Sequence, residues 1–287
     1  GTLVRIGNFE IQSISGGRFR LDGGAMFGVV PKPLWDRKSP ANELNRIQLD
    51  TNCLCLIREK EIVLCDTGFG TKLSSKEQMH LEASSGNCLV ENLEKVGIQP
   101  EAVTHVIFSH LHFDHAGGAT CFDSHQNLQL TFPNAVHVMQ EQEKTDALGN
   151  APELEGNYFV PELKFLFEKA RCQIINGGAE IIPGIQVEKT GGHTAGHQAI
   201  RIRGEDRGGI YLGDLCPTTS HLNIFWTMAY DAFQLDVRRK KRALLNEIAR
   251  DELTLFFDHD AQFQAANILR KSSTSFEVGQ VLPSRVE

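Results

Sequence analysis

The stretch that decides the fold is FSHLHFDHAGG, residues 108–118, which places three histidines and an aspartate within six residues. It continues the apolar run AVTHVIFS, residues 102–109, whose length and polar boundaries are typical of a buried strand. The histidines therefore stand where a strand ends, a position at which the sheet fixes the backbone and the loop exposes the side chains. If His110 and His112 lie on a short extended segment, both rings point to one side and can share one metal ion.

Three further places show the same pattern of a strand signal followed by polar, metal-binding residues. They are TGGHTAGH with His193, YLGDL with Asp214, and FFDHD with His259. Because Asp114 and His115 follow the turn of the chain, we expect them to serve a second ion together with His259, while His193 completes the first site. A carboxylate offers two equivalent oxygen donors, so Asp214 is expected to bridge the two ions. The predicted metal ligands are His110, His112, Asp114, His115, His193, Asp214 and His259.

This donor set predicts two divalent metal ions about 3.5 Å apart with a hydroxide shared between them. Imidazole suits zinc, iron, cobalt and nickel, and the carboxylates extend the choice to manganese. Zinc is the first expectation. Asp114 is placed to steer the nucleophile and to carry a proton to the leaving group. No serine or cysteine shows the base and orienting partner that covalent catalysis requires.

The ordered motifs HLHFDH, GGHTAGH, LGDL and FDHD, preceded by LCDTGFG around Asp66, resemble those of the metallo-β-lactamase superfamily of dinuclear metallohydrolases. They extend from Asp66 to His259 and so cover most of the chain. The resemblance implies an α+β fold, a four-layer αββα sandwich with two mixed β-sheets face to face, helices outside and the metals at one edge. It also implies that Asp66 supports a ligand rather than binds metal. His197, four residues after His193, is expected to orient its loop.

Because Asp114, His115 and His259 are all present, the chain is similar to the members that fill both sites, among them quorum-quenching lactonases, the methyl parathion hydrolase type and glyoxalase II. Glyoxalase II is disfavoured, since the segment after His259 is too short for its C-terminal helical domain. Asp258 and Asp260 flank His259 and are expected to support it or to be solvated. A non-catalytic metal-binding regulatory protein is a further alternative, against which the intact ligand set argues.

Two apolar loops, residues 25–35 and 223–233, are candidates for the walls of a substrate pocket. If they line the site, they favour a neutral, partly apolar ester, such as an N-acyl homoserine lactone, over a charged substrate. Burial in the core or a dimer contact explains the same residues equally well. The candidate pocket residues are Met26, Phe27, Trp35, Phe225 and Trp226.

The region after the bridging aspartate departs from the lactonases of the superfamily, which often carry a tyrosine there. This chain has Pro217 and Thr218 instead, and Tyr230 is the candidate that assists the carbonyl oxygen. The departure keeps an aryl phosphotriester or aryl ester, as hydrolysed by the methyl parathion hydrolase type, as the alternative substrate.

Composition limits the partners of the protein. A net charge of −7 offers no basic field for nucleic acid, and the basic run at residues 238–242 is typical of a solvated helix face. No apolar segment is long enough to span a membrane, and residues 1–10 show no signal-peptide pattern. Seven scattered cysteines indicate reduced, mostly buried thiols in a cytoplasmic protein. We expect a single domain over residues 1–287, a small-molecule substrate and a possible homodimer.

Local patterns complete the expected fold. Strand-spaced apolar residues predict antiparallel hairpins over residues 3–24 and 47–70, separated by a long ordered loop at 25–40. Residues 74–98 predict two helices. A long amphipathic helix is expected over 231–250, because Val237, Leu244, Leu245 and Ile248 share one face.

Overall fold

The computed structural model describes residues 4–282 and 285–286, which form two large mixed β-sheets. We call the sheet that holds most of the N-terminal half the first sheet and the other the second sheet. In spatial order the first sheet consists of β1 (Val4–Ile6), β2 (Phe9–Asp22), β3 (Arg46–Arg58), β4 (Glu61–Cys65), β5 (His105–Ile107), β8 (Val136–Gln140) and β9 (Arg171–Ile175), with β17 (Arg285–Val286) also paired to β2. The second sheet consists of β10 (Ala179–Ile182), β11 (Ile185–Lys189), β12 (Gln198–Ile202), β13 (Gly209–Tyr211), β14 (Thr254–Phe256), β15 (Ala265–Arg270) and β16 (Phe276–Leu282).

Both sheets contain parallel and antiparallel pairs. β4, β5, β8 and β9 run parallel in the first sheet, and β13 and β14 run parallel in the second, while their other neighbours are antiparallel. The carboxyl ends of parallel strands meet at one edge of a sheet. The segments that follow β4, β5, β13 and β14 therefore start from common edges, and these segments carry the predicted site residues.

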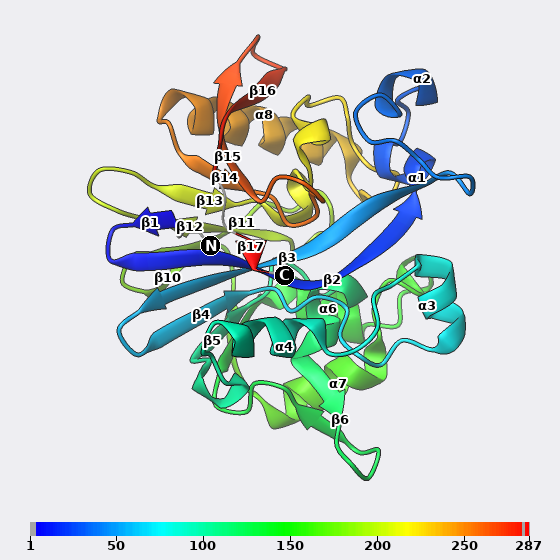
Figure 1. The fold of residues 1–287 in the computed structure, drawn as a ribbon, viewed down its shortest axis with the longest axis vertical. Coiled ribbons are helices and arrows are strands. Elements are labelled where there is room, and N and C mark those ends of the chain that lie inside the picture. Colours follow the sequence, from blue (N-terminus) through cyan, green and yellow to red (C-terminus); the bar gives the residue numbers. More distant parts are fainter. Residues whose placement is uncertain (1–3, 283–284, 287) are drawn as a thin grey trace.

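The helices cover the outer faces of the two sheets (Figure 1). α8 (Gln234–Arg250) packs on the second sheet, where Val237, Leu245 and Ile248 contact its buried strand residues. α4 (Cys88–Lys95), α6 (Glu141–Leu148) and α7 (Val160–Lys169) cover the first sheet on the opposite side of the molecule. The shorter elements are α1 (Gly23–Phe27), α2 (Lys32–Trp35), α3 (Ser75–Leu81), α5 (Phe113–Ala116) and a small hairpin of β6 (Thr120–Phe122) and β7 (Leu128–Leu130). The predicted αββα order of layers is confirmed.

Strand alternation explains how one sheet serves two cores. In β3 the side chains of Leu54 and Leu56 join the cluster between the sheets, whereas Cys53 and Cys55 face the helices. The two sulfurs thus lie on one face and fill the core, and all seven cysteines are free thiols. A single domain over 1–287 stays a prediction, supported by this core shared between the sheets and by the pairing of β17 with β2.

Three local predictions need correction. The loop at 25–40 contains the helices α1 and α2. The long helix begins at Gln234 rather than Asp231, because Asp231 accepts hydrogen bonds from the backbone N–H of Met228 and from His193 and so belongs to the preceding turn. The segment after His259 forms β15 and β16, two strands of the second sheet that its mixed polar sequence did not predict.

Within the described residues, no helix has the length and apolar character needed to cross a membrane. The basic run on α8 is also not uniformly solvated. Arg239, Lys240 and Arg242 are exposed, but Lys241 is buried and its Nζ donates to the backbone oxygen of Trp226, 2.9 Å away. Lys241 thereby fastens the loop at 223–233 to the helix that follows it.

Candidate metal centre

The ligand-rich loop begins where β5 ends, at Ile107. The backbone N–H of Phe108 still bonds to Val138 of the neighbouring β8, so the chain leaves the sheet at a fixed point. His112 then caps the short helix α5, which contains Asp114 and His115. The end of β5 and the first turn of α5 therefore bring four predicted ligands close together. These are His110, His112, Asp114 and His115.

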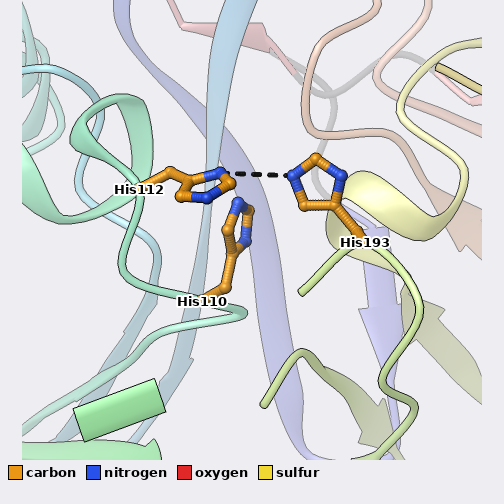
Figure 2. Close-up of side chains that lie close together, drawn as sticks. All are labelled: His110, His112 and His193. Atoms are coloured by element: carbon orange, nitrogen blue, oxygen red, sulfur yellow. Dashed lines mark hydrogen bonds between the residues drawn. The ribbon is translucent and has the colours of Figure 1, made fainter. Parts of the chain in front are cut away.

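His110, His112 and His193 form the first donor group, shown in Figure 2. One ring nitrogen from each lies within 4.8 Å of the other two, and Nδ1 of His112 lies 3.3 Å from Nε2 of His193. His193 comes from the loop after β11, so the group joins the two sheets. Nε2 of His110 is buried and has no hydrogen-bond partner among the described residues.

Asp114, His115, Asp214 and His259 form the second donor group, whose four side chains are all buried. Nε2 of His259 lies 3.2 Å from Nε2 of His115 and 3.2 Å from Oδ2 of Asp114. Asp214, which follows β13, lies between the groups. Its Oδ2 is 3.1 Å from Nε2 of His193, and its Oδ1 is 3.1 Å from Nε2 of His259. This is the position that a bridging carboxylate requires.

These donors fit two divalent ions. Imidazole nitrogens converge on one another and on carboxylates, and both Nε2 of His110 and Oδ1 of Asp214 are buried without a hydrogen bond. Buried polar atoms are normally satisfied, so the unsatisfied donors indicate a missing cationic partner. Imidazole and carboxylate are the ligands that zinc and its first-row neighbours bind.

The charges within the centre are unevenly distributed. Burial lowers the pKa of His112 to about 3 and that of His110 well below its usual value, so both rings are neutral and able to bind metal. Burial also opposes protonation of His193, but Asp214 and Asp231 outweigh it and raise the pKa of His193 to about 10. Although burial alone would raise the pKa of Asp214, the facing rings of His115, His259 and His193 hold it well below its ordinary value.

Asp66, at the end of β4, holds the second group in place without pointing at its centre. Its Oδ1 accepts from the backbone N–H of Ser109, and its Oδ2 accepts from Nδ1 of His115 at 2.8 Å and from the hydroxyl of Tyr211 at 2.7 Å. The bond to Nδ1 leaves Nε2 of His115 free to bind metal, the arrangement found around metal-bound histidines. Asp66 has a left-handed backbone (φ 62°), an uncommon conformation for a residue other than glycine.

The other histidines are oriented in the same way. Nδ1 of His193 donates to Asp231 at 2.7 Å, and Nδ1 of His259 donates to the backbone oxygen of Asp50 at 2.7 Å. Nδ1 of His197 lies 2.7 Å from the hydroxyl oxygen of Thr190 and thereby ties down the loop that carries His193. Asp231 was missed at the sequence level, where it was assigned to a helix terminus.

Glu143 and Tyr158 are further supporting residues that no motif indicated. Glu143 is buried on α6, and its carboxylate accepts from the backbone N–H of Leu111, at 2.8 Å, between the two ligands His110 and His112. The hydroxyl of Tyr158 donates to the same carboxylate, while its ring lies 5.3 Å from that of His112. Glu143 therefore anchors the ligand loop to α6.

Replacing Glu143 by alanine is expected to lower the free energy of unfolding by about 2 kcal/mol, because the N–H of Leu111 would be buried without an acceptor. Glu143→Gln keeps an accepting oxygen and should recover most of this loss. Urea unfolding of both variants measures the difference. The exposed Glu141 on the same helix provides the control, Glu141→Ala. Equal stability of Glu143→Ala and wild type would show that the loop does not depend on this contact.

The structure corrects three of the five pocket candidates. Met26, Phe27 and Trp35 are at most 1% exposed, because Phe27 stacks between Trp35 and His221 inside a hydrophobic cluster. Phe225 is 50% exposed, and Trp226 is half-buried with its edge on Phe27.

Tyr230, the candidate for assisting the carbonyl oxygen, is 42% exposed. Partial burial, together with Asp22 and Asp114, raises the pKa of its hydroxyl to about 12. Its hydroxyl therefore keeps its proton at neutral pH.

Comparison with known proteins agrees with this geometry. The sequence model of the metallo-beta-lactamase superfamily matches residues 46–259, and the chain belongs to this superfamily. It is therefore an enzyme of the metal-dependent hydrolase class, as predicted.

Several metal-dependent hydrolases are similar to the chain along most of their length. The chain is 27% identical to the N-acyl homoserine lactonase AiiA of Bacillus thuringiensis subsp. kurstaki, covering 88% of this chain and 94% of that protein. Its fold matches a probable metal-dependent hydrolase from Staphylococcus aureus with a TM-score of 0.85 at 28% identity, covering 98% of this chain and 100% of the other. It also matches AidC, a dizinc quorum-quenching lactonase, with a TM-score of 0.80 at 18% identity and 98% coverage of both chains.

Proposed function

We propose that the protein is a dinuclear metal-dependent hydrolase that opens the ring of N-acyl homoserine lactones. The observation that carries the proposal is the position of Asp214 between a group of three histidines and a group of two histidines and Asp114. The similarity to N-acyl homoserine lactonases over nearly their whole length supports the choice of substrate.

Two divalent ions bound to these seven residues would supply hydroxide near neutral pH and polarise the carbonyl oxygen of the lactone. Zinc is the proposed metal, supported by the three-histidine group, with iron, manganese, cobalt or nickel as alternatives. Reaction of water with the carbonyl carbon breaks the ring C–O bond. The alcohol oxygen takes up a proton, and the new carboxylic acid releases one at neutral pH.

Asp114 is the proposed proton carrier of this reaction. Burial opposes its ionisation, but His115 and His259 outweigh burial and keep the pKa of Asp114 below its ordinary range. The ionised carboxylate can accept a proton from water and return it to the alcohol oxygen that leaves. The short contacts to Nε2 of both histidines hold it at the centre during the transfer.

Apolar surface next to the centre supports an acyl chain as part of the substrate. Phe113, between His112 and Asp114, stacks on Phe159 with ring centroids 5.4 Å apart. Tyr158 and Phe159 also line a cavity of about 840 Å³ whose wall combines the apolar Phe122 and Leu128 with charged residues, among them Lys72 and Glu162. This volume is within the range of small-molecule sites. These aromatic residues replace Met26, Phe27 and Trp35 as the proposed walls.

The test is acid release at neutral pH from N-acyl homoserine lactones of increasing chain length, measured with enzyme loaded with zinc, manganese or cobalt. Aryl phosphotriesters and simple aryl esters are measured in parallel. Lactone turnover well above that of the other two classes supports the proposal. Turnover confined to phosphotriesters or aryl esters would replace it with the methyl parathion hydrolase type of activity.

Tyr230→Phe is expected to lower kcat for lactones by up to about 100-fold with little change in KM, because a donor to the carbonyl oxygen acts mainly in the transition state. Because the side chain is partly exposed, we expect thermal unfolding of the variant to match that of wild type. An unchanged kcat would remove Tyr230 from the mechanism.

We further propose a cytoplasmic location, supported by the seven free thiols. A homodimer formed through the loop at 223–233 is also proposed, supported by the exposure of Phe225. Sedimentation of the wild type and of Phe225→Ser tests the dimer.

A further inference from the structure

Asp258 is a buried carboxylate with no direct hydrogen bond. It is 1% exposed, and neither of its side-chain oxygens has a hydrogen-bond partner among the described residues. Buried polar groups of native proteins are normally paired with a donor or a cation. The contacts that Asp258 does make are with histidines of the second donor group.

The carboxylate of Asp258 points at the second donor group. Its Oδ2 lies 3.7 Å from Nε2 of His259 and 3.9 Å from Nε2 of His115, the two ring nitrogens that face the centre. Two ligands of one ion, each about 2.1 Å from it, are roughly 3 to 4 Å apart at ordinary bond angles. Oδ2 of Asp258 lies at such a separation from both histidines, and Asp258 also forms a candidate metal-binding group with His115 and Asp66.

The backbone holds Asp258 in this position. The N–H of Asn52 donates to the backbone oxygen of Asp258, and the side-chain amide of Asn52 donates to the backbone oxygens on either side, those of Phe257 and Asp260. Asp260, by contrast, turns away from the centre and accepts from the N–H and hydroxyl of Thr219. The turn therefore directs Asp258 and His259, consecutive in the chain, to the same centre.

We infer that Asp258 is an additional ligand of the ion held by Asp114, His115, Asp214 and His259, an inference that rests on the proposed dinuclear centre. This ion then has three carboxylates and two imidazoles around it, whereas the other has three imidazoles and Asp214. Carboxylates favour harder ions such as manganese, and imidazoles suit zinc. The two metal-binding positions consequently differ in the metal that they prefer. Asp258 increases this difference because it adds a third carboxylate to one of them.

Asp258→Asn tests the inference, because asparagine keeps the size and hydrogen-bonding capacity of the side chain but is a much weaker ligand. Bound metal is counted by mass spectrometry after dialysis against a chelator, over a series of free manganese or zinc concentrations. We expect wild type to hold two ions and the variant to bind one of them at least about tenfold more weakly, since even residues that only support a ligand contribute 10- to 100-fold. Asp260→Asn, in the same turn, is the control and should retain both ions.

Thermal unfolding gives an independent readout. Added metal should raise the melting temperature of Asp258→Asn less than that of wild type, because the variant binds one ion more weakly. The cobalt-loaded proteins should also differ in their visible absorption, which reports the number and type of ligands.

Two results would overturn the inference. If Asp258→Asn binds both ions with wild-type affinity and gives the wild-type cobalt spectrum, Asp258 is no ligand, although the dinuclear centre stands. If wild type itself holds fewer than two ions at saturating metal, the dinuclear centre fails and the role of Asp258 fails with it.

Discussion

Asp214→Ala is expected to abolish lactone hydrolysis, with kcat/KM reduced by more than about 100-fold, because even a residue that only orients a metal ligand contributes 10- to 100-fold. The reason is the position of Asp214. Its Oδ2 lies 3.1 Å from Nε2 of His193 and 3.3 Å from Nε2 of His115, so one side chain serves both donor groups. Its removal leaves neither position with a full set of ligands.

Acid release and metal content are measured on the same sample of Asp214→Ala. The first reports the loss of activity, and the second reports the loss of bound ions. We expect activity and at least one of the two ions to be lost together. Asp236→Ala, which removes an exposed aspartate paired only with Arg239 on α8, is the matched control and should behave as wild type. Full activity of Asp214→Ala would contradict the proposed centre at its main point.

Gly118→Ala is expected to lower the free energy of unfolding by about 3 kcal/mol, at the upper end of what overpacking costs. A Cβ atom at this position would lie 1.9 Å from the backbone oxygen of Thr67, and no flexible side chain can yield there. Thr67 in turn binds the backbone oxygen of His115 through both its N–H and its hydroxyl. The added methyl group therefore separates the loop that carries Asp66 from the helix that carries His115.

Chemical unfolding measures this loss, and metal content at a fixed free concentration shows whether the second donor group loosens with it. Gly178→Ala is the control, since a Cβ there would be 3.5 Å from its nearest neighbour, an ordinary contact. If Gly118→Ala were as stable as Gly178→Ala, the close packing of α5 on the end of β4 would not limit the stability of the site.

The ligands could be predicted from sequence because each follows a strand, and strand ends are recognisable from apolar runs. Asp231 and Glu143 could not, because they bond to His193 and Leu111, which are 38 and 32 residues away in the chain. Tyr158 could not either, because it acts through its hydrogen bond to Glu143. Met26, Phe27 and Trp35 show the opposite error. A cluster of large apolar residues looks the same in sequence whether it lines a pocket or fills a core. Only the structure, which buries all three and stacks Phe27 between Trp35 and His221, places them in the core.

Asp258 illustrates a third limit. An aspartate beside a ligand histidine is as compatible with solvent as with the centre, and alternation along a strand does not apply in the turn after β14. The direction of Asp258 depends on hydrogen bonds from Asn52, some two hundred residues earlier in the chain, and such a contact cannot be recognised from the local sequence.

The donor groups draw on both halves of the sandwich, His110 to His115 from the first sheet and His193, Asp214 and His259 from the second. A bound ion is thus a cross-link between the sheets that closes loops of up to about 150 residues, comparable in reach to a long-range disulfide. Unlike a disulfide, this cross-link opens and closes with the free metal concentration, which sets by mass action how firmly the two sheets are held together. We therefore expect the resistance of the protein to proteolysis to rise with the metal supply around it.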